Sequence, residues 1–364
     1  MLPFYFPTIS KDISNVKKVL KSTYISEGKL VKKFESKISK FLNLKYCVTT
    51  NSGTSALHLA LAAAEINKDD EVIIPTQTFI ATGLAVLYQR ARPIFADINL
   101  EDGNISIEDI KKKITKKTKA IVVVHWGGYP CEMDEILKIA RKNNIKVIED
   151  AAHCFGGKYK NRSIGNISDF TCFSFQATKH LTTGDGGLVA CKNKKDYLKL
   201  LKLRWFGFNR KLKPSFYGDR ADVVTDIGFK YHMNDYSASL GLANLKLMKS
   251  LLKYHENIGN YYSKSLKNIK GLKLLKFKKD RKHTFWFYQI LVSNRLRFIK
   301  KVRSLKIPCS LVNFRIDKHD IFRKYKLNLP DQEKFELQKI SLPVNIKINK
   351  KIIDKLSKEL KKGW

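Results

Sequence analysis

From about residue 45 the chain alternates short runs of β-branched and aromatic residues with stretches that have the apolar spacing of helices. This alternation is typical of a parallel sheet wrapped by helices. The pattern therefore predicts an α/β fold with a sheet of about seven strands. The predicted strands are KYCVTT (45–50), EVIIP (71–75), PIFADI (93–98), AIVVVHW (120–126), KVIED (146–150), DFTCFSF (169–175) and GGLVAC (186–191), with helices such as 54–65 and 133–144 between them.

After about residue 190 longer helical stretches replace the regular alternation. Residues 251–269 have the spacing of a long helix, HTFWFYQILV (283–292) is typical of a strand, and 297–307 and 348–364 are typical of helices. We therefore expect two domains, a large one over residues 1–245 and a smaller α+β domain over residues 246–364.

The formal net charge of +37 raises the question of a polyanionic partner. Lysines occur almost everywhere along the chain, together with many Ile and Asn residues, which favours a compositional bias over a dedicated nucleic-acid surface. No window approaches the roughly 20 apolar residues of a membrane span, and the start MLPFYFPTIS lacks the features of a signal peptide. We expect a soluble, cytoplasmic protein with no specific nucleic-acid partner and no membrane partner.

The six cysteines are scattered singly, without CxxC pairs or histidines at metal-ligand spacing. This arrangement predicts neither a metal site nor a disulfide framework, and most of these cysteines are expected to be reduced core residues. They are Cys47, Cys131, Cys154, Cys172, Cys191 and Cys309.

The segment NSGTSALHLAL (51–61) places a glycine turn at the start of a strong helix former. Gly53, Thr54 and Ser55 would present free backbone N–H groups and the positive end of a helix dipole, which suits a phosphate. An ordinary capped helix is the structural alternative.

The segment KVIEDAAHCFGG (146–157) ends a strand of buried type in Glu149 and Asp150. A carboxylate at the carboxyl end of a parallel strand lies where α/β proteins bind ligands. If Asp150 met a pyridine nitrogen, it would keep that nitrogen protonated and let the ring accept electrons. Asp150 could equally cap the next helix.

In DFTCFSFQATKHLTTGDGGLVAC (169–191) a strand delivers Ser174 and, five residues later, Lys179, in a loop rich in Thr and Gly. A lysine partly withdrawn from water has a destabilised ammonium and becomes a usable nucleophile. In VIIPTQTFIAT (72–82) the loop residue Phe79 could stack on a flat ring or belong to the core.

Taken together, SGTSALHLAL, PTQTFIAT, EDAAHCFGG and SFQATKHLTTGDGG resemble, in this order and spacing, the DegT/DnrJ/EryC1/StrS family of nucleotide-sugar aminotransferases, which depend on pyridoxal 5'-phosphate (PLP). The resemblance runs nearly end to end, because GFKYHMNDYSASLGLANL and ISLPVN also match segments of the family. It implies the fold type I of PLP-dependent transferases, with a mixed seven-stranded sheet in the large domain.

The resemblance also implies roles for individual residues. Lys179 would be the Schiff-base lysine and proton shuttle, and Asp150 would pair with the pyridinium nitrogen. His153, where the family commonly has Gln, would contact the ring oxygen. Phe79 takes the stacking position. The residues implied at the cofactor phosphate are Gly53, Thr54, Ser55 and Ser174, with Lys230 from a partner chain.

Such enzymes work as homodimers in which each site is completed by the neighbouring chain. Lys230 and His232 stand where the family usually has Asn and Arg, and GDGG replaces the usual GEGG. These departures leave open which residue of the partner contacts the phosphate, and Lys230 and Asn234 are the two candidates.

The expected reaction is a two-step transamination in which an amino acid, with glutamate as the expected donor, gives its amine to a nucleotide-linked 4-keto-6-deoxy sugar for surface polysaccharides. One alternative is a sugar dehydratase on the same fold, which typically has histidine in place of the Schiff-base lysine. A second alternative is a non-catalytic nucleic-acid-binding regulator. The aromatic and basic residues Trp126, Tyr129, Arg315 and His319 are expected either to line the sugar pocket or to be structural.

Overall fold

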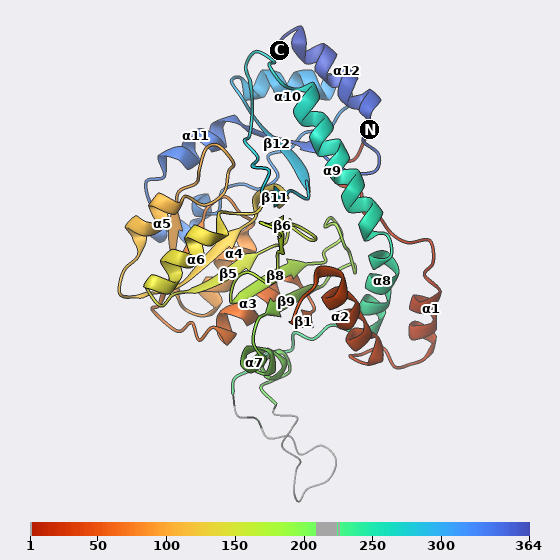
Figure 1. Cartoon of the computed structure of the whole chain (residues 1–364), viewed down its shortest axis with the longest axis vertical. Helices are drawn as coiled ribbons and strands as arrows, with labels where there is room; N and C mark the ends of the chain where they lie inside the picture. The colour runs from red at the N-terminus through yellow and green to blue at the C-terminus, as the bar shows by residue number, and fades with distance from the viewer. Residues whose placement is uncertain (1, 209–223, 225) are drawn as a thin grey trace, which may run out of the picture.

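The computed structural model describes residues 2–208, 224 and 226–364. Within these residues seven strands form a mixed sheet in the order β1-β9-β8-β5-β4-β2-β3, with helices on both faces (Figure 1). The predicted α/β class and all seven predicted strands are confirmed. The strands are β1 (Tyr46–Thr50), β2 (Glu71–Pro75), β3 (Arg92–Ala96), β4 (Thr118–Val124), β5 (Lys146–Asp150), β8 (Phe170–Ser174) and β9 (Gly187–Cys191).

The middle of the sheet is parallel, whereas β9 runs antiparallel to both β8 and β1. Parallel strands covered on both faces need apolar residues at every position, which explains the continuous run in β4. There Ile121 and Val123 enter the core on one face, and Ala120 and Val122 enter the core on the other. Because β4, β5 and β8 are parallel, their carboxyl ends lie at one edge of the sheet.

Helices from distant parts of the chain cover the two faces of the large sheet (Figure 1). The amphipathic helix α6 (Met133–Lys142), predicted from its apolar spacing, packs one buried stripe on the sheet. On the same face lie α2 (Lys29–Leu42), α5 (Ile107–Lys113), α6 (Met133–Lys142) and α8 (Asp235–Leu245), and α1 (Ser14–Lys21) packs beside α8. On the opposite face lie α3 (Gly53–Ala63), α4 (Ile80–Tyr88) and α7 (Lys194–Arg204).

The C-terminal part of the chain forms a second, antiparallel sheet with its own apolar core. Its strands are β10 (Leu272–Leu274), β12 (Phe287–Val292) and β13 (Lys339–Pro343), and its helices are α9 (Met248–Ser265), α10 (Arg295–Ser304), α11 (Pro330–Gln338) and α12 (Lys350–Lys361). This arrangement is α+β, but the division of the chain at residues 245 and 246 stays a prediction.

The strand predicted over residues 283–292 begins only at Phe287. Phe285 has a φ of 49°, which an extended strand does not accept. The backbone N–H groups of Thr284 and Trp286 instead donate to the carbonyls of Gly128 and Gly127. The segment before β12 is therefore fastened to the loop that follows β4.

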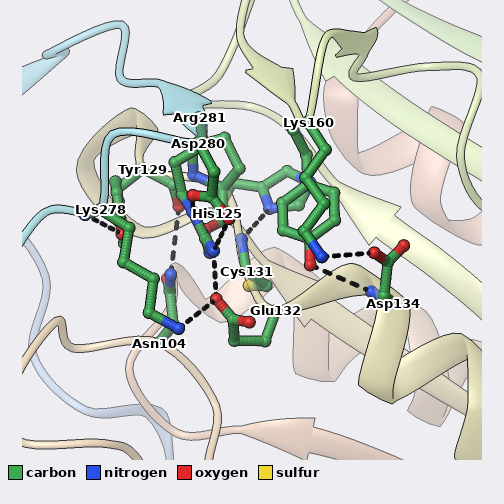
Figure 2. A network of polar contacts seen from close by, with 12 residues as sticks. Asn104, His125, Tyr129, Cys131, Glu132, Asp134, Lys160, Lys278, Asp280 and Arg281 are labelled. Carbon is green, nitrogen blue, oxygen red and sulfur yellow. Dashed lines mark hydrogen bonds and ion pairs between the residues drawn. The ribbon is translucent and has the colours of Figure 1, made fainter.

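A network of polar contacts strengthens this attachment (Figure 2). Arg281, in the short strand β11 (Arg281–Lys282), donates to the Pro130 carbonyl at 3.0 Å and pairs with Glu132 and Asp280. The Lys278 backbone N–H donates to the Tyr129 hydroxyl at 2.8 Å. β11 also pairs with the hairpin of β6 (Lys158–Tyr159) and β7 (Arg162–Ser163).

The sequence made predictions about the cysteines and about membrane-spanning helices. All six cysteines are buried and free, as predicted for reduced core residues. In the part of the chain that the structure describes, no helix combines the length and the apolar character needed to cross a membrane.

Candidate active site

A cavity of about 360 Å³ lies at the carboxyl ends of the central strands. The last residues of β4, β5 and β8, which are Val124, Asp150 and Ser174, all line it. This is the edge at which open α/β sheets bind ligands. The cavity also receives Lys179 from the loop after β8 and Trp286 from the segment before β12.

Asp150 is buried at the end of β5 and faces this cavity. Its carboxylate accepts hydrogen bonds from the Thr82 hydroxyl at 2.8 Å and from the Ala152 backbone N–H at 3.1 Å. Burial raises the pKa of the Asp150 carboxyl, and these two hydrogen bonds and nearby Lys179 oppose the rise. A buried carboxylate whose ionised form is disfavoured gains most from a cationic partner brought by a ligand.

Lys179 brings an amine into the same cavity. Its backbone N–H donates to the Gln176 carbonyl, which closes a turn directly after β8. Burial lowers the pKa of the Lys179 ammonium to about 7, although Asp150 acts in the opposite direction. A large share of the amine is therefore neutral near pH 7, which is the form that attacks a carbonyl carbon.

His153, in the loop after β5, stacks on Trp286 with ring centroids 3.9 Å apart and an interplanar angle of 22°. Burial, together with the nearby positive charge of Lys179, holds the pKa of this imidazole well below its usual value, so His153 is neutral. Its Nδ1 is buried and has no hydrogen-bond partner among the described residues. An unpaired polar atom at the wall of a cavity is suited to a ligand atom.

The first turn of α3 lies at the other side of the cavity. Ser52 caps this helix by accepting a hydrogen bond from the Ser55 N–H at 3.0 Å, while Gly53 and Thr54 line the cavity. A Cβ on Gly53 would lie 2.8 Å from the Cβ of Ser174, so only glycine lets the helix start approach the end of β8 this closely. Backbone N–H groups and hydroxyls thus converge where an anion can bind.

Phe79 begins α4 at the rim of the cavity, and 57% of its surface is exposed in the single chain. It is not a core phenylalanine, which was the alternative that the sequence left open. Its ring can cover a flat ligand that enters above Asp150.

The comparisons with known proteins agree with this geometry. The model of the DegT/DnrJ/EryC1/StrS aminotransferase family matches residues 8–361. The chain belongs to this family. It is therefore an aminotransferase, and its predicted identity is confirmed.

Individual relatives cover most of the chain. A GDP-perosamine synthase of Escherichia coli O157:H7 is 38% identical over 292 residues, 80% of this chain and 78% of that protein. A UDP-4-amino-4,6-dideoxy-N-acetyl-beta-L-altrosamine transaminase of Campylobacter jejuni is 34% identical over 77% of this chain and 73% of that protein. The sugar aminotransferase CalS13 of Micromonospora echinospora superposes with a TM-score of 0.95 at 28% identity, over the full length of both chains. These matches confirm fold type I of the PLP-dependent transferases.

Two residues that the family resemblance assigns to the phosphate have other contacts in the single chain. The Ser55 hydroxyl donates to the Asn51 side chain at 2.7 Å and lies 2.8 Å from the Ser52 hydroxyl. Lys230 is exposed, and its carbonyl accepts from the Asn51 side chain at 3.3 Å. Neither residue lines the cavity in the single chain, so their roles at the phosphate stay predictions.

Some lining residues were missed from the sequence. Tyr5, Trp286 and Asn313 come from segments far from the four motifs, and nothing in their local pattern pointed to the site. Ser52, by contrast, stands beside Gly53 in a helix-start pattern and could have been found as the cap.

The aromatic and basic residues considered for the sugar pocket lie elsewhere in the structure. Trp126 and Tyr129 are buried beneath the segment before β12, and Tyr129 belongs to the network of Figure 2. Arg315 is fully buried and pairs with Asp317 and Glu333. His319 packs edge-on against Phe314. Each of these contacts supports the structural alternative.

Proposed function

We propose that this aminotransferase uses PLP and transfers an amino group onto a 4-keto-6-deoxy sugar carried by a nucleoside diphosphate, with glutamate as the donor and products used in surface polysaccharides. The observation that carries the proposal is that one cavity joins the Lys179 amine, the Asp150 carboxylate and the first turn of α3. Relatives named as a GDP-perosamine synthase and a UDP-amino-sugar transaminase support the class of substrate.

The residues of the cavity fit PLP. The first turn of α3 with Gly53, Thr54 and Ser174 offers donors for the phosphate, and Asp150 offers a buried carboxylate for a protonated ring nitrogen. The unpaired His153 Nδ1 offers a contact for the ring oxygen. The cofactor supplies an aldehyde carbon that takes up the amino group and a ring that accepts the electrons of a breaking C–H bond.

Each side chain has a task during the reaction. The Lys179 amine, a large share of which is neutral near pH 7, would hold the cofactor through its aldehyde. The same amine would take a proton from the α-carbon of the donor and deliver one to the sugar carbon. The Asp150 carboxylate would keep a pyridine nitrogen protonated. Phe79, at the rim of the cavity, would cover the ring and keep water from it.

The position of His180 supports an aminotransferase over a dehydratase. His180 Nε2 lies 3.0 Å from the Thr284 carbonyl, whereas Lys179 lines the cavity. The residue facing the cofactor position is therefore lysine, and the neighbouring histidine is held by the segment before β12. This agrees with SFQATK placing lysine five residues after Ser174.

A defined substrate panel tests the proposal. The PLP-loaded protein is incubated with nucleotide-linked 4-keto-6-deoxy and 3-keto sugars and with several amino acids, and products are identified by mass and NMR. We expect a 4-amino sugar with glutamate as the donor, and no product with Lys179→Arg, which keeps a cation but lacks the nucleophile. Loss of water from the sugar would indicate the dehydratase, and the absence of amination with every nucleotide sugar would refute the substrate class.

We further propose that the site is shared in a homodimer, with Lys230 of one chain reaching the phosphate held by the other. Lys230 is exposed beside Asn51, which precedes the first turn of α3. Asn234, the other candidate, already caps α8 by accepting from the Ser237 N–H at 2.9 Å. An ammonium facing a phosphate is a strong charge-assisted contact.

Mixed dimers test the sharing. Lys179→Ala and Lys230→Ala chains, each inactive alone, would together restore one complete site per mixed dimer. We expect recovery of up to about half the wild-type rate per mixed dimer. No recovery despite demonstrated subunit exchange, or normal cofactor affinity in Lys230→Ala, would remove Lys230 from the site.

A further inference from the structure

Trp286 is tied to the loop that carries Lys179. Its indole Nε1 donates to the Thr178 carbonyl at 2.8 Å, one residue before Lys179. Its backbone N–H donates to the Gly127 carbonyl at 2.9 Å in the loop after β4. The side chain is 6% exposed. Both ends of this tryptophan are therefore fixed, and its ring is held in place relative to the amine.

The ring of Trp286 is at the centre of a stack. The ring centroid of His153 lies 3.9 Å from that of Trp286 with an interplanar angle of 22°. The ring centroid of Tyr5 lies 4.9 Å from it with an interplanar angle of 20°. The Lys179 Nζ lies 3.6 Å from the centroid of the Trp286 ring, well within the range of a cation–π contact. Trp286 thus touches both the lysine and the histidine proposed to meet the cofactor.

The Lys179 amine lacks the partners that a withdrawn ammonium usually has. Within residues 2–208, 224 and 226–364 its Nζ forms no hydrogen bond and no ion pair. An ammonium away from water and without acceptors is costly. The face of an indole carries partial negative charge and is the strongest aromatic site for a cation.

We propose that Trp286 is a positioning residue that holds the ε-ammonium of Lys179 on its indole ring whenever this amine is not bonded to the cofactor. The inference rests on the proposed role of Lys179. In each catalytic cycle the amine leaves the cofactor and must stay close enough, and protonated for long enough, to deliver a proton. The indole retains the charged amine inside the cavity without a carboxylate that would fix it in place.

Other titratable groups lie in the cavities that Lys179 lines. Asp150 favours the charged form, whereas the histidines near Lys179 are neutral because burial lowers their pKa values. The groups that share a cavity with Lys179 are Asp150, His153 and Asp185 from the large sheet and its loops, Tyr5 from the N-terminal segment, and His180 and His255 on the side towards α9.

The test compares Trp286→Phe with Trp286→Leu in protein freed of cofactor. These variants leave similar space but differ in the presence of an aromatic face. The neutral amine reacts with cyanate, so the pH dependence of carbamylation, measured by mass spectrometry on the peptide that contains Lys179, gives the pKa of Lys179. Exposed Lys138 on α6 serves as the internal reference.

We expect the pKa of Lys179 to be lower in Trp286→Leu than in Trp286→Phe by roughly half a unit to one and a half units. An equal or higher pKa in Trp286→Leu would overturn the proposal, because a purely structural tryptophan would not separate the two variants in this direction.

Biosynthetic incorporation of fluorinated tryptophans keeps the test decisive if Trp286→Leu does not fold. Fluorine withdraws electron density from the ring face with little change of shape, so the pKa of Lys179 should fall stepwise with the number of fluorines. A constant pKa across that series would refute the cation–π contact. The measurement uses neither cofactor nor turnover, so an aminotransferase assay that failed would contradict the proposed function and leave this result standing.

Discussion

Glu149 and Asp150 are consecutive residues of β5, and their side chains lie on opposite faces of the sheet in very different surroundings. Glu149 is fully buried and has every partner it needs. His125 Nε2 lies 2.8 Å away, and the hydroxyls of Ser168 and Thr171 each donate at 2.7 Å. Burial alone would raise the pKa of Glu149, but these hydrogen bonds outweigh it and hold the pKa below its usual value.

Among the described residues, Asp150 has only Thr82 and the Ala152 backbone as donors, and burial raises its pKa. One carboxylate is thus stabilised by its own chain, and the other faces a cavity with its ionised form disfavoured. The difference shows how a fold separates a structural carboxylate from one that gains from a ligand. Substitutions at Asp150 and at its neighbour Lys179 should therefore lower catalytic activity, whereas a substitution at Glu149 should lower stability.

The largest effect should come from removing the amine that faces Asp150. We expect Lys179→Ala to abolish turnover and leave the fold intact, because the side chain supplies a reacting amine and little packing. Product formation and the visible absorbance of the PLP-loaded protein are the measurements, with circular dichroism to check the fold. Wild-type activity in this variant would contradict the assignment of Lys179.

The next largest effect should come from Asp150→Asn. A neutral amide cannot stabilise a cationic ring nitrogen as a carboxylate does, so kcat should fall by about 10²–10³-fold. Stability at neutral pH should not fall, because the ionised form of Asp150 is disfavoured in the free chain. Steady-state kinetics and thermal unfolding test both parts. Near-normal kcat would make Asp150 a structural residue.

The sequence alone predicted the large sheet well because each of its strands has a local signature. Continuous β-branched runs indicate strands covered on both faces, and all seven runs are strands in the structure. Asp150 and Lys179 could also be predicted from local sequence, because Asp150 ends β5 and Lys179 closely follows β8, each within a short motif. The family resemblance then related the motifs to one another.

The other side of the cavity could not be predicted in this way. Trp286 and Tyr5 face Lys179 because the segment before β12 is fastened to the loop after β4, which is a tertiary contact. The positive φ of Phe285 that ends the predicted strand early has no signal in HTFWFYQILV. Trp126 and Tyr129 were plausible pocket residues because they are aromatic, but both are buried in the packing of the protein and do not line the cavity.

Glu149→Gln is the matched counterpart of Asp150→Asn, since the same chemical change is made one residue away. An amide would face hydroxyl donors with an N–H group, so we expect a loss of about 1–3 kcal/mol in the free energy of unfolding. Because the pKa of Glu149 is lowered in the folded chain, its stabilisation is present at neutral pH and lost as the pH falls below the unfolded value of about 4.3.

Urea unfolding of the two proteins at pH 7.5 and at several pH values below about 4.3 measures this effect. The deficit of Glu149→Gln should be large at pH 7.5 and should shrink as the solution becomes acidic. A variant as stable as the wild type at pH 7.5, or one that loses activity while keeping its stability, would erase the distinction between the two carboxylates.

The smallest effect concerns Asp102, a third carboxylate whose pKa burial raises, to about 6. It lies near Arg281 and Glu132 of the network in Figure 2, outside the cavity, so a raised pKa here should have no catalytic consequence. Because the pKa of Asp102 is higher in the folded chain than in the unfolded chain, the folded state is not destabilised by this carboxyl below about pH 4. The free energy of unfolding then falls as the pH rises towards 6.

Asp102→Asn avoids that loss, since an amide oxygen can still accept from the Asn104 N–H. We expect Tm to rise by about 1–3 °C at pH 7.5, a smaller gain at pH 5, and unchanged turnover. Reduced turnover in a folded Asp102→Asn protein would mean that a raised carboxylate pKa matters for function outside the cavity as well.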